Sequence, residues 1–187
     1  MYQLPTKFVI SPIGGKQYND TKEVNGKELI VSTSIENHLD VQRIGVVKAL
    51  PFGYKGDVIL GDLVVVHHNT FRIMLDHKGV PEQSENYISK DLFAVTRDAM
   101  YMIIRGEEII PTDDNVFVLP IINQTVWHGE KEEDNIGIAQ YVNSILKSQG
   151  VENGSKIAFK NYSKYQFEIL GRKFYLMKNR RVVAKLS

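Results

Sequence analysis

The side chains best suited to chemistry in this sequence are its histidines, serines and carboxylates, and their spacing favours no reactive site. His67 and His68 follow the apolar segment 63–66. Successive side chains of a strand point to opposite faces, so the two rings are not expected to share one metal ion. No sequence frame places a serine nucleophile beside a base. We therefore predict no catalytic residue, no metal and no cofactor, and the chain is not expected to be an enzyme.

The amino-acid composition narrows the classes of protein to which the chain can belong. The 187 residues include no cysteine, which removes disulfides, thiolate nucleophiles and cysteine-based zinc sites. The 23 Lys and Arg nearly balance the 22 Asp and Glu, whereas dedicated nucleic-acid binders usually carry a larger basic excess. No secretory signal is expected, and the longest apolar runs are too short to cross a bilayer. We expect a cytoplasmic protein with no membrane partner.

The end of the chain mixes basic and aromatic side chains, which is also the pattern of OB-type barrels that bind single-stranded nucleic acid. Tyr165, Phe167 and Ile169 alternate with polar residues, however, which predicts a half-buried strand. Binding of single-stranded nucleic acid by an OB-like barrel stays an alternative, although it is not favoured. A structural or assembly protein of a virus that reuses the barrel is another alternative, because a fold does not fix a function.

The apolar segments are short, rich in Val, Ile, Phe and Tyr, and separated by Gly, Asn, Asp or Pro. This pattern predicts a mostly β protein with turns spaced as in small barrels. Helical periodicity is weak. The best helix candidate is 138–150, and a second is 89–103.

An internal repeat organises the chain. Four pairs of segments recur in the same order: KFVISPI (7–13) with NVFVLPI (115–121), IGVV (44–47) with IGIA (136–139), GDLVVV (61–66) with GSKIAF (154–159), and YISKDLFAV (87–95) with YLMKNRRVV (175–183). The repeat predicts two domains, 1–104 and 105–187, joined by the acidic connector 105–114.

Laid out in this way, each half resembles the GroES co-chaperonin family. The resemblance rests on a first strand such as NVFVLPI, a loop, a strand introduced by Gly, a Gly-Asp turn into an apolar strand, and a closing strand–turn–strand. It implies two tandem GroES-like small β-barrels whose roof hairpins are reduced. Phage-encoded members similarly lack the roof, so the expected compartment is the host cytoplasm if the protein is viral.

The family docks on a GroEL-type chaperonin ring through an apolar triplet in a mobile loop and assists ATP-dependent protein folding. In the first half this loop spans about 14–43, and the resemblance assigns docking to Leu29, Ile30 and Val31. A flexible loop loses conformational entropy when it binds, so a few buried apolar side chains must offset that cost. The alternative is that 28–35 is an ordinary strand with alternating burial.

The second half carries a shorter, more acidic loop at about 122–135. Val126 and Trp127 occupy the triplet position there. Tryptophan is a frequent anchor of protein interfaces, and this is the only Trp of the chain. A lone Trp in a small barrel can equally belong to the core.

The resemblance also implies a homo-oligomeric ring. Family rings are seven-fold, and whole two-domain chains cannot fill seven equivalent places, since three chains give six barrels and four give eight. Alternatively, seven chains each give one barrel to the ring and stack the other above it as a second tier. Pairing between a final strand and a neighbour's first strand would hide sheet edges. The strand residues expected at this subunit interface are Phe8, Ile10, Val182, Val183 and Leu186.

Overall fold

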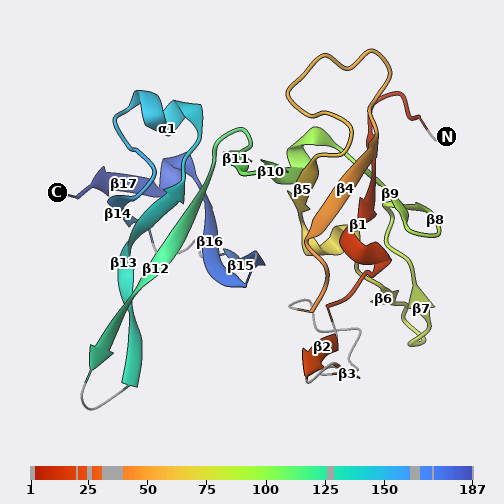
Figure 1. Ribbon diagram of the computed structural model, residues 1–187, viewed down its shortest axis with the longest axis horizontal. Coiled ribbons are helices and arrows are strands. Elements are labelled where there is room, and N and C mark those ends of the chain that lie inside the picture. The colour runs from red at the N-terminus through yellow and green to blue at the C-terminus, as the bar shows by residue number, and fades with distance from the viewer. Residues whose placement is uncertain are drawn as a thin grey trace. The chain divides into compact units, whose positions relative to one another are not determined.

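A computed structural model describes most of the chain (Figure 1). The described residues are 3–19, 21–24, 27–30, 40–125, 129–160, 165–169 and 171–186; of 21–24, 27–30, 124, 125, 129 and 130 only the backbone is described. The chain forms two compact units, Met1–Glu107 and Glu108–Ser187. The repeat in the sequence predicted the boundary after residue 104.

Most of the strands of the first unit belong to a seven-stranded sheet with the order β11-β10-β5-β4-β1-β9-β8, and two small two-stranded sheets pair β2 with β3 and β6 with β7. The elements are β1 (Phe8–Pro12), η1 (Ile13–Gly15), β2 (Thr21–Val24), β3 (Lys27–Ile30), β4 (Ile44–Ala49), β5 (Leu63–Val66), η2 (His68–Thr70), β6 (Met74–Leu75), β7 (Pro81–Glu82), β8 (Tyr87–Ser89), β9 (Leu92–Val95), η3 (Arg97–Ala99) and β10 (Met100–Arg105).

The second unit is built on a six-stranded sheet with the order β15-β16-β12-β13-β14-β17. Its elements are β11 (Glu108–Pro111), β12 (Asn115–Thr125), β13 (Gly129–Tyr141), α1 (Ser144–Ser148), β14 (Ser155–Phe159), β15 (Tyr165–Ile169), β16 (Arg172–Lys178), η5 (Asn179–Arg181) and β17 (Val182–Lys185). β11, which opens this unit in sequence, is the end strand of the seven-stranded sheet.

The two sheets repeat one topology. Six strands of the first sheet, β10-β5-β4-β1-β9-β8, correspond one by one to β17-β14-β13-β12-β16-β15 of the second. The register agrees as well, because Pro12 pairs with Gly45 in the first unit and Pro120 pairs with Gly137 in the second. The internal repeat is therefore confirmed for its first three segment pairs.

The fourth segment pair of the predicted repeat is in the wrong register. Phe93 of β9 pairs with Ile10, and Tyr175 of β16 pairs with Val118, so Phe93 and Tyr175 are the equivalent residues. The predicted repeat matches Tyr175 with Tyr87 instead. Burial explains the correct alignment, since LFAV (92–95) and FYLM (174–177) are the segments that enter the two cores.

A glycine of β4 and a glycine of β13 each face the proline of the neighbouring strand, β1 or β12. A Cβ at Gly137 would lie 2.5 Å from Cγ1 of Val118 and 2.8 Å from the carbonyl oxygen of Leu119. A Cβ at Gly45 would lie 2.8 Å from Cδ1 of Ile10, the flexible end of a side chain. The close approach is thus common to both units, but only the second presses against backbone.

The two units differ immediately after this shared register. In the first unit β1 ends at Pro12 and the chain turns away through η1, where Gly14 and Gly15 have φ of 70° and 71°. Glycine adopts these left-handed values without the steric cost that a side chain brings. In the second unit Ile122 stands in the place of Gly14, and β12 continues beside β13 as far as Thr125.

The second core is a contiguous apolar cluster beneath β12, β13 and α1. Val116 and Val118 enter this core, whereas Phe117 lies next to Phe167 and Phe174, with ring centroids 6.1 and 6.4 Å away. Successive residues of a strand alternate between its faces, so β12 packs on both sides. The cluster comprises Val116, Val118, Ala139, Val142, Leu146, Val151, Ile157, Phe159, Tyr175 and Met177.

The prediction of a mostly β protein is confirmed. Closed barrels are not observed, because each of the two sheets ends in strands with a single neighbour among the described residues, and end strands such as β8 and β17 are short. Of the two predicted helices, the one at 89–103 is wrong and the one at 138–150 is confirmed only in part. Segment 89–103 forms β9, η3 and β10, and helix α1 covers only Ser144–Ser148 because Ile138 is paired in β13.

Replacing these two glycines by alanine should destabilise the units unequally. We expect Gly137→Ala to lower the free energy of unfolding by about 2 to 3 kcal/mol, because the new methyl group meets backbone that cannot rotate away. Gly45→Ala should cost about 1 kcal/mol, since the Ile10 side chain can shift. Urea unfolding of both variants measures this order, with Lys48→Ala and Glu168→Ala as exposed strand controls. Equal losses at both glycines would contradict the account.

Candidate interaction surfaces

The loop predicted at about 14–43 has both ends fixed in a hydrogen-bonded stem. The N–H of Asn19 donates to the carbonyl of Asp40 at 2.7 Å, and the N–H of Gln42 donates to the carbonyl of Gln17 at 2.8 Å. The two ends of the loop are therefore held side by side, and we call the residues between them, 20–39, the excursion.

The return side of the stem is buried. Tyr18 forms a β-bridge with Val41, which is 1% exposed. The side-chain oxygen of Gln42 accepts the N–H groups of Arg43 and Ile44, at 2.9 and 3.0 Å. These contacts satisfy backbone donors where the chain re-enters the sheet at β4.

Within the excursion, β2 and β3 pair with each other and, among the described residues, with no other strand. Thr21 pairs with Ile30 and Lys22 with Leu29, so two of the three residues assigned to docking lie on β3. Val31 lies outside the described residues. An isolated two-stranded hairpin is only marginally stable in water, which makes it suited to reshaping on a partner. The docking role of the triplet stays a prediction.

The second predicted loop, 122–135, is largely a hairpin. β12 runs to Thr125 and β13 starts at Gly129, while Val126 and Trp127 lie outside the described residues. Asn123 donates its side-chain amide to Glu133 across the two strands at 3.0 Å. The equivalent place in the second unit therefore has regular cross-strand pairing.

Glu132 ties this hairpin to β16. It accepts a hydrogen bond from Lys173 at 2.6 Å and another from the hydroxyl of Tyr175. The bond to Glu132 raises the pKa of Lys173, while burial first and Glu132 second raise the pKa of Tyr175. The lysine thus stays charged and the phenol stays neutral at pH 7, and both hold the hairpin against the sheet.

The aromatic residues considered for nucleic-acid binding are mostly interior. Phe167 and Phe174 are 1% and 2% exposed, and Tyr165 packs edge-to-face on Phe167 at 4.8 Å. Gln166 and Glu168 point outward, so the half-buried strand predicted here is confirmed. Base stacking requires exposed aromatic faces, and Phe167 and Phe174 do not offer them.

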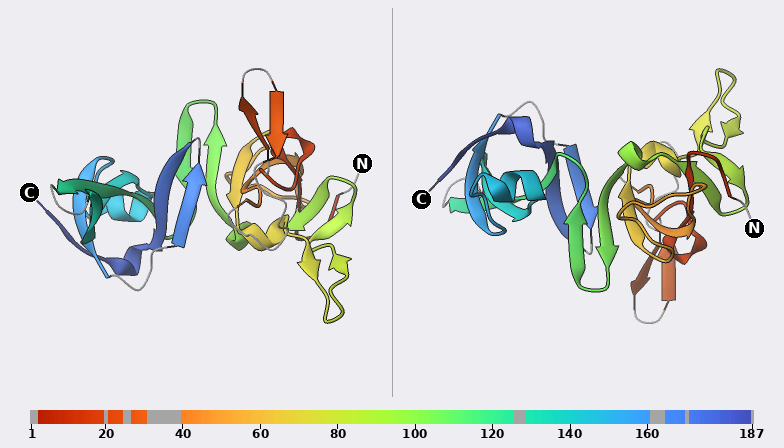
Figure 2. Two further views of the ribbon diagram at one scale, coloured as in Figure 1. Left: turned by 90° about the horizontal axis from the view of Figure 1, so that it is seen from below. Right: turned by 90° about the horizontal axis from the view of Figure 1, so that it is seen from above.

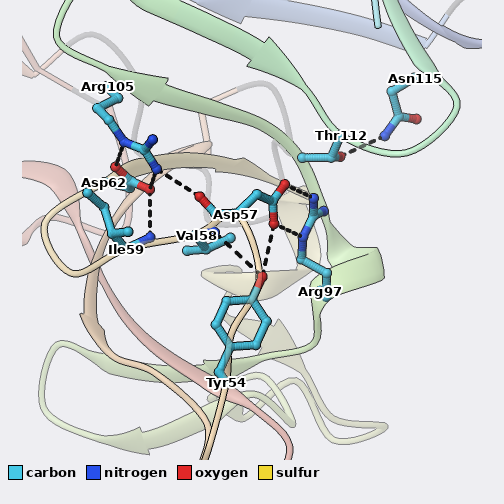
Figure 3. A network of polar contacts seen from close by, with 9 residues as sticks. All are labelled: Tyr54, Asp57, Val58, Ile59, Asp62, Arg97, Arg105, Thr112 and Asn115. Atoms are coloured by element: carbon cyan, nitrogen blue, oxygen red, sulfur yellow. Dashed lines mark hydrogen bonds and ion pairs between the residues drawn. The ribbon is translucent and has the colours of Figure 1, made fainter. Parts of the chain in front are cut away.

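The loop between β4 and β5 carries a polar network that the sequence did not suggest (Figure 3). The side chain of Asp62 is 1% exposed, and Arg105 binds both of its carboxylate oxygens, at 2.9 and 2.8 Å. The N–H of Ile59 donates to the same carboxylate at 2.9 Å. Burial alone would raise the pKa of Asp62, but these hydrogen bonds hold it below its ordinary value.

A second pair closes the far side of the loop. Arg97 binds both carboxylate oxygens of Asp57, with Nη2 2.5 Å from Oδ2, and the Tyr54 hydroxyl donates to Oδ1 at 2.9 Å (Figure 3). Arg105 also donates to the Asp57 carbonyl at 2.8 Å. The loop is thereby fixed from two elements, η3 and β10.

This fixed loop displays apolar side chains. Phe52 and Leu60 are each 60% exposed, and Ile59 is 49% exposed. Leu60 borders a shallow groove that is also lined by Gln3, Lys48, Ala49 and Leu50. The loop stands where the resemblance implies a reduced roof hairpin.

His67 and His68 lie side by side, contrary to the alternation expected on a strand. Their ring centroids are 4.1 Å apart, because the strand ends at Val66 and η2 begins at His68. Burial, with a smaller effect of Arg43, lowers the pKa of His67. Among the described residues no three His, Cys, Asp or Glu side chains gather in a way that could hold a metal ion.

The strands expected at a subunit interface fall into two groups. Phe8 and Ile10 are at most 1% exposed, and both edges of β1 are occupied by β4 and β9. In this structure β1 therefore has no free edge for the expected pairing with a neighbour's strand, because β4 and β9 flank it on both sides. Val182 and Val183 lie on the end strand β17, where Val183 is 62% exposed, and Leu186 follows it with a bond to Lys156.

No family model matches the chain, and no curated protein matches it. Within the described part of the chain, no helix has the length and apolar character needed to cross a membrane.

The two ion pairs of the β4–β5 loop should differ in their contribution to stability. Arg105→Met leaves the buried Asp62 carboxylate without its guanidinium, and we expect the free energy of unfolding to fall by about 3 kcal/mol. Arg97→Met removes a partner from Asp57, whose side chain is 49% exposed, and should cost under about 1 kcal/mol. Urea unfolding of both variants tests this; equal losses would show that burial does not set the difference.

Lowering the pH should weaken the Arg105–Asp62 ion pair selectively. The folded pKa of Asp62 lies below its unfolded value, so its contribution is complete at neutral pH and is lost as pH falls through the folded pKa. The stability difference between wild type and Arg105→Met should therefore shrink between about pH 5 and pH 2, around the ordinary Asp pKa of about 3.9. A difference that stays constant over this range would rule out Asp62 as the titrating group.

Proposed function

We propose that the protein is a tandem co-chaperonin that caps a GroEL-type chaperonin ring and assists ATP-dependent protein folding. It has no catalytic residue in this proposal. The loop of the first unit supplies the contact with the ring, and the two units are GroES-like domains in tandem.

The proposal rests on one observation: the two units share the same strand pairing but differ in the segment that follows the paired proline. Both sheets have the same strand order and the same Pro–Gly pairing, which supports the tandem arrangement. After this shared pairing the first unit releases a closed excursion that contains an isolated hairpin, whereas the second continues as a paired hairpin.

An excursion with fixed ends suits weak, repeated docking. The stem at Gln17–Gln42 holds both ends of the loop together, so the hairpin searches a limited region around the stem before it binds. Several such contacts around a ring then add through multivalency. The second unit, with its hairpin tied to β16 through Glu132, is proposed to face away from the chaperonin.

Wild-type protein should form a complex with a GroEL-type ring in the presence of ATP or ADP. We expect Ile30→Asp to weaken this complex at least tenfold, since a charge replaces an apolar side chain in the docking segment. Glu28→Ser, on the same strand, is the matched control and should bind like wild type. Co-sedimentation at several protein concentrations gives the affinities.

The outcomes separate two levels of the proposal. A wild-type chain that never binds the ring with nucleotide contradicts the function. Equal binding by wild type and Ile30→Asp contradicts only the assignment of the triplet. Mass measurement in solution tests the expected homo-oligomer. The resemblance implies a ring, and the measured mass gives the number of chains in it, seven being one of the expected numbers.

A further inference from the structure

The first unit carries a protruding arm that the second unit lacks. We define the arm as residues 71–82, which contain β6 and β7. The connection from β5 to β8 spans 67–86, whereas the equivalent connection from β14 to β15 spans only 160–164. Figure 2 shows the arm in yellow-green, standing away from β4 and β5. An addition to one copy of a repeat indicates a role that the shared fold does not require.

Local hydrogen bonds close the tip of the arm. One side-chain oxygen of Asp76 accepts the N–H groups of Lys78 and Val80, at 2.8 and 2.7 Å. The N–H of Asp76 donates to the carbonyl of Val80 at 2.9 Å, and the N–H of Gly79 returns to the carbonyl of Asp76 at 3.0 Å. These hydrogen bonds all lie within residues 76–80 and define the shape of the turn.

The arm presents apolar side chains beside this hydrogen-bonded turn. Met74 and Leu75 on β6 are each 40% exposed, and Val80 beside the turn is 53% exposed. Their exposure leaves apolar surface in contact with water, which is unfavourable unless a partner covers it. A preorganised frame lowers the entropy cost of that covering, and methionine adapts to irregular surfaces.

The base of the arm is anchored in the core. Phe71 is fully buried against Phe93, with ring centroids 4.9 Å apart. The buried hydroxyl of Ser84 donates to the carbonyl of Thr70 at 2.7 Å. Core packing on Phe93 of β9 and this hydrogen bond therefore hold the base of the arm on the sheet.

The same base is bonded to the stem of the docking loop. The side-chain amide of Gln17 donates to the carbonyl of Phe71 and to the side chain of Gln83, each at 2.9 Å. The Tyr18 hydroxyl accepts the N–H of Ile73 at 2.9 Å, and burial raises the pKa of this phenol. The residues that hold the loop thus also hold the arm.

We propose that the arm is a second docking element for the chaperonin ring, working beside the β2–β3 hairpin. The proposal rests on the function proposed above. The stem fixes both elements to one place, and Figure 1 shows them at the same end of the first unit. Figure 2 shows that they extend in different directions, so a broad protein surface reaches both and a small ligand does not.

Substitution of the arm tests this directly. The double variant Leu75→Ser with Val80→Ser removes apolar surface and leaves the turn formed by Asp76 intact. We expect its affinity for the GroEL-type ring with ADP to fall at least tenfold, which corresponds to about 1.4 kcal/mol. Lys78→Ser, at the same tip, is the matched control and should bind as wild type does. Urea unfolding of the three proteins confirms that the fold is kept.

The outcomes distinguish the arm from the function. If wild type binds the ring and the double variant binds equally well, the arm is not a docking element, although the co-chaperonin proposal stands. If wild type does not bind, the proposed function itself fails. Loss of self-association in the double variant, with unchanged ring binding, would show that a second copy of the chain covers the arm, and would overturn the inference.

Tyr18→Phe provides a second, independent variant. It removes the hydroxyl that joins stem and arm and keeps the ring of the tyrosine. We expect a several-fold loss of ring affinity together with faster hydrogen exchange in 71–82. Faster exchange without any loss of affinity would contradict the coupling of arm and docking loop.

Discussion

The fold depends on how closely a central strand can approach its neighbour. Pro12 faces Gly45 and Pro120 faces Gly137, and in each unit the absence of a side chain at the glycine lets the two strands meet over the core. This pairing sets the register of β4 and β13, and through them the position of β5 and β14. Ile10 and Val118, two residues before these prolines, are fully buried.

The residues just after the proline decide which elements each unit can present. Gly14 and Gly15 turn the first chain out of the sheet at once, so that a stem, an isolated hairpin and the arm gather at one end of that unit. Ile122 keeps the second chain extended, and Glu132 then secures the resulting hairpin to β16. The same topology thereby gives a first unit with projecting elements and a second unit in which the equivalent segment is a paired hairpin.

The sequence predicted the parts of the fold that local patterns determine. Segments with a fixed proline or glycine, such as 7–13 and 136–139, were aligned in the register that the structure has. The fourth segment pair has no such proline or glycine, and similarity of sequence alone aligned Tyr175 with Tyr87 instead of Phe93. The helix expected at 138–150 shrank to α1 because strand pairing of Ile138 outweighs its helical spacing.

The candidate surfaces were less accessible from the sequence. Arg97 and Arg105 meet Asp57 and Asp62 across 40 and 43 positions, and no local pattern announces such pairs. The contact of Tyr18 with Ile73 joins segments 55 positions apart, so the link between stem and arm emerges only from the folded chain. The apolar cluster around Ile30 was visible as a motif, since it lies within one short segment.

The central claim is that the projecting elements of the first unit meet a chaperonin ring. Amide hydrogen exchange of the whole chain, with and without a GroEL-type ring and ADP, tests it most directly. We expect slower exchange in 21–30 and 71–82 when the ring is present, and unchanged exchange in the equivalent hairpin of β12 and β13. Protection confined to the second unit, or no protection in either unit, would contradict it.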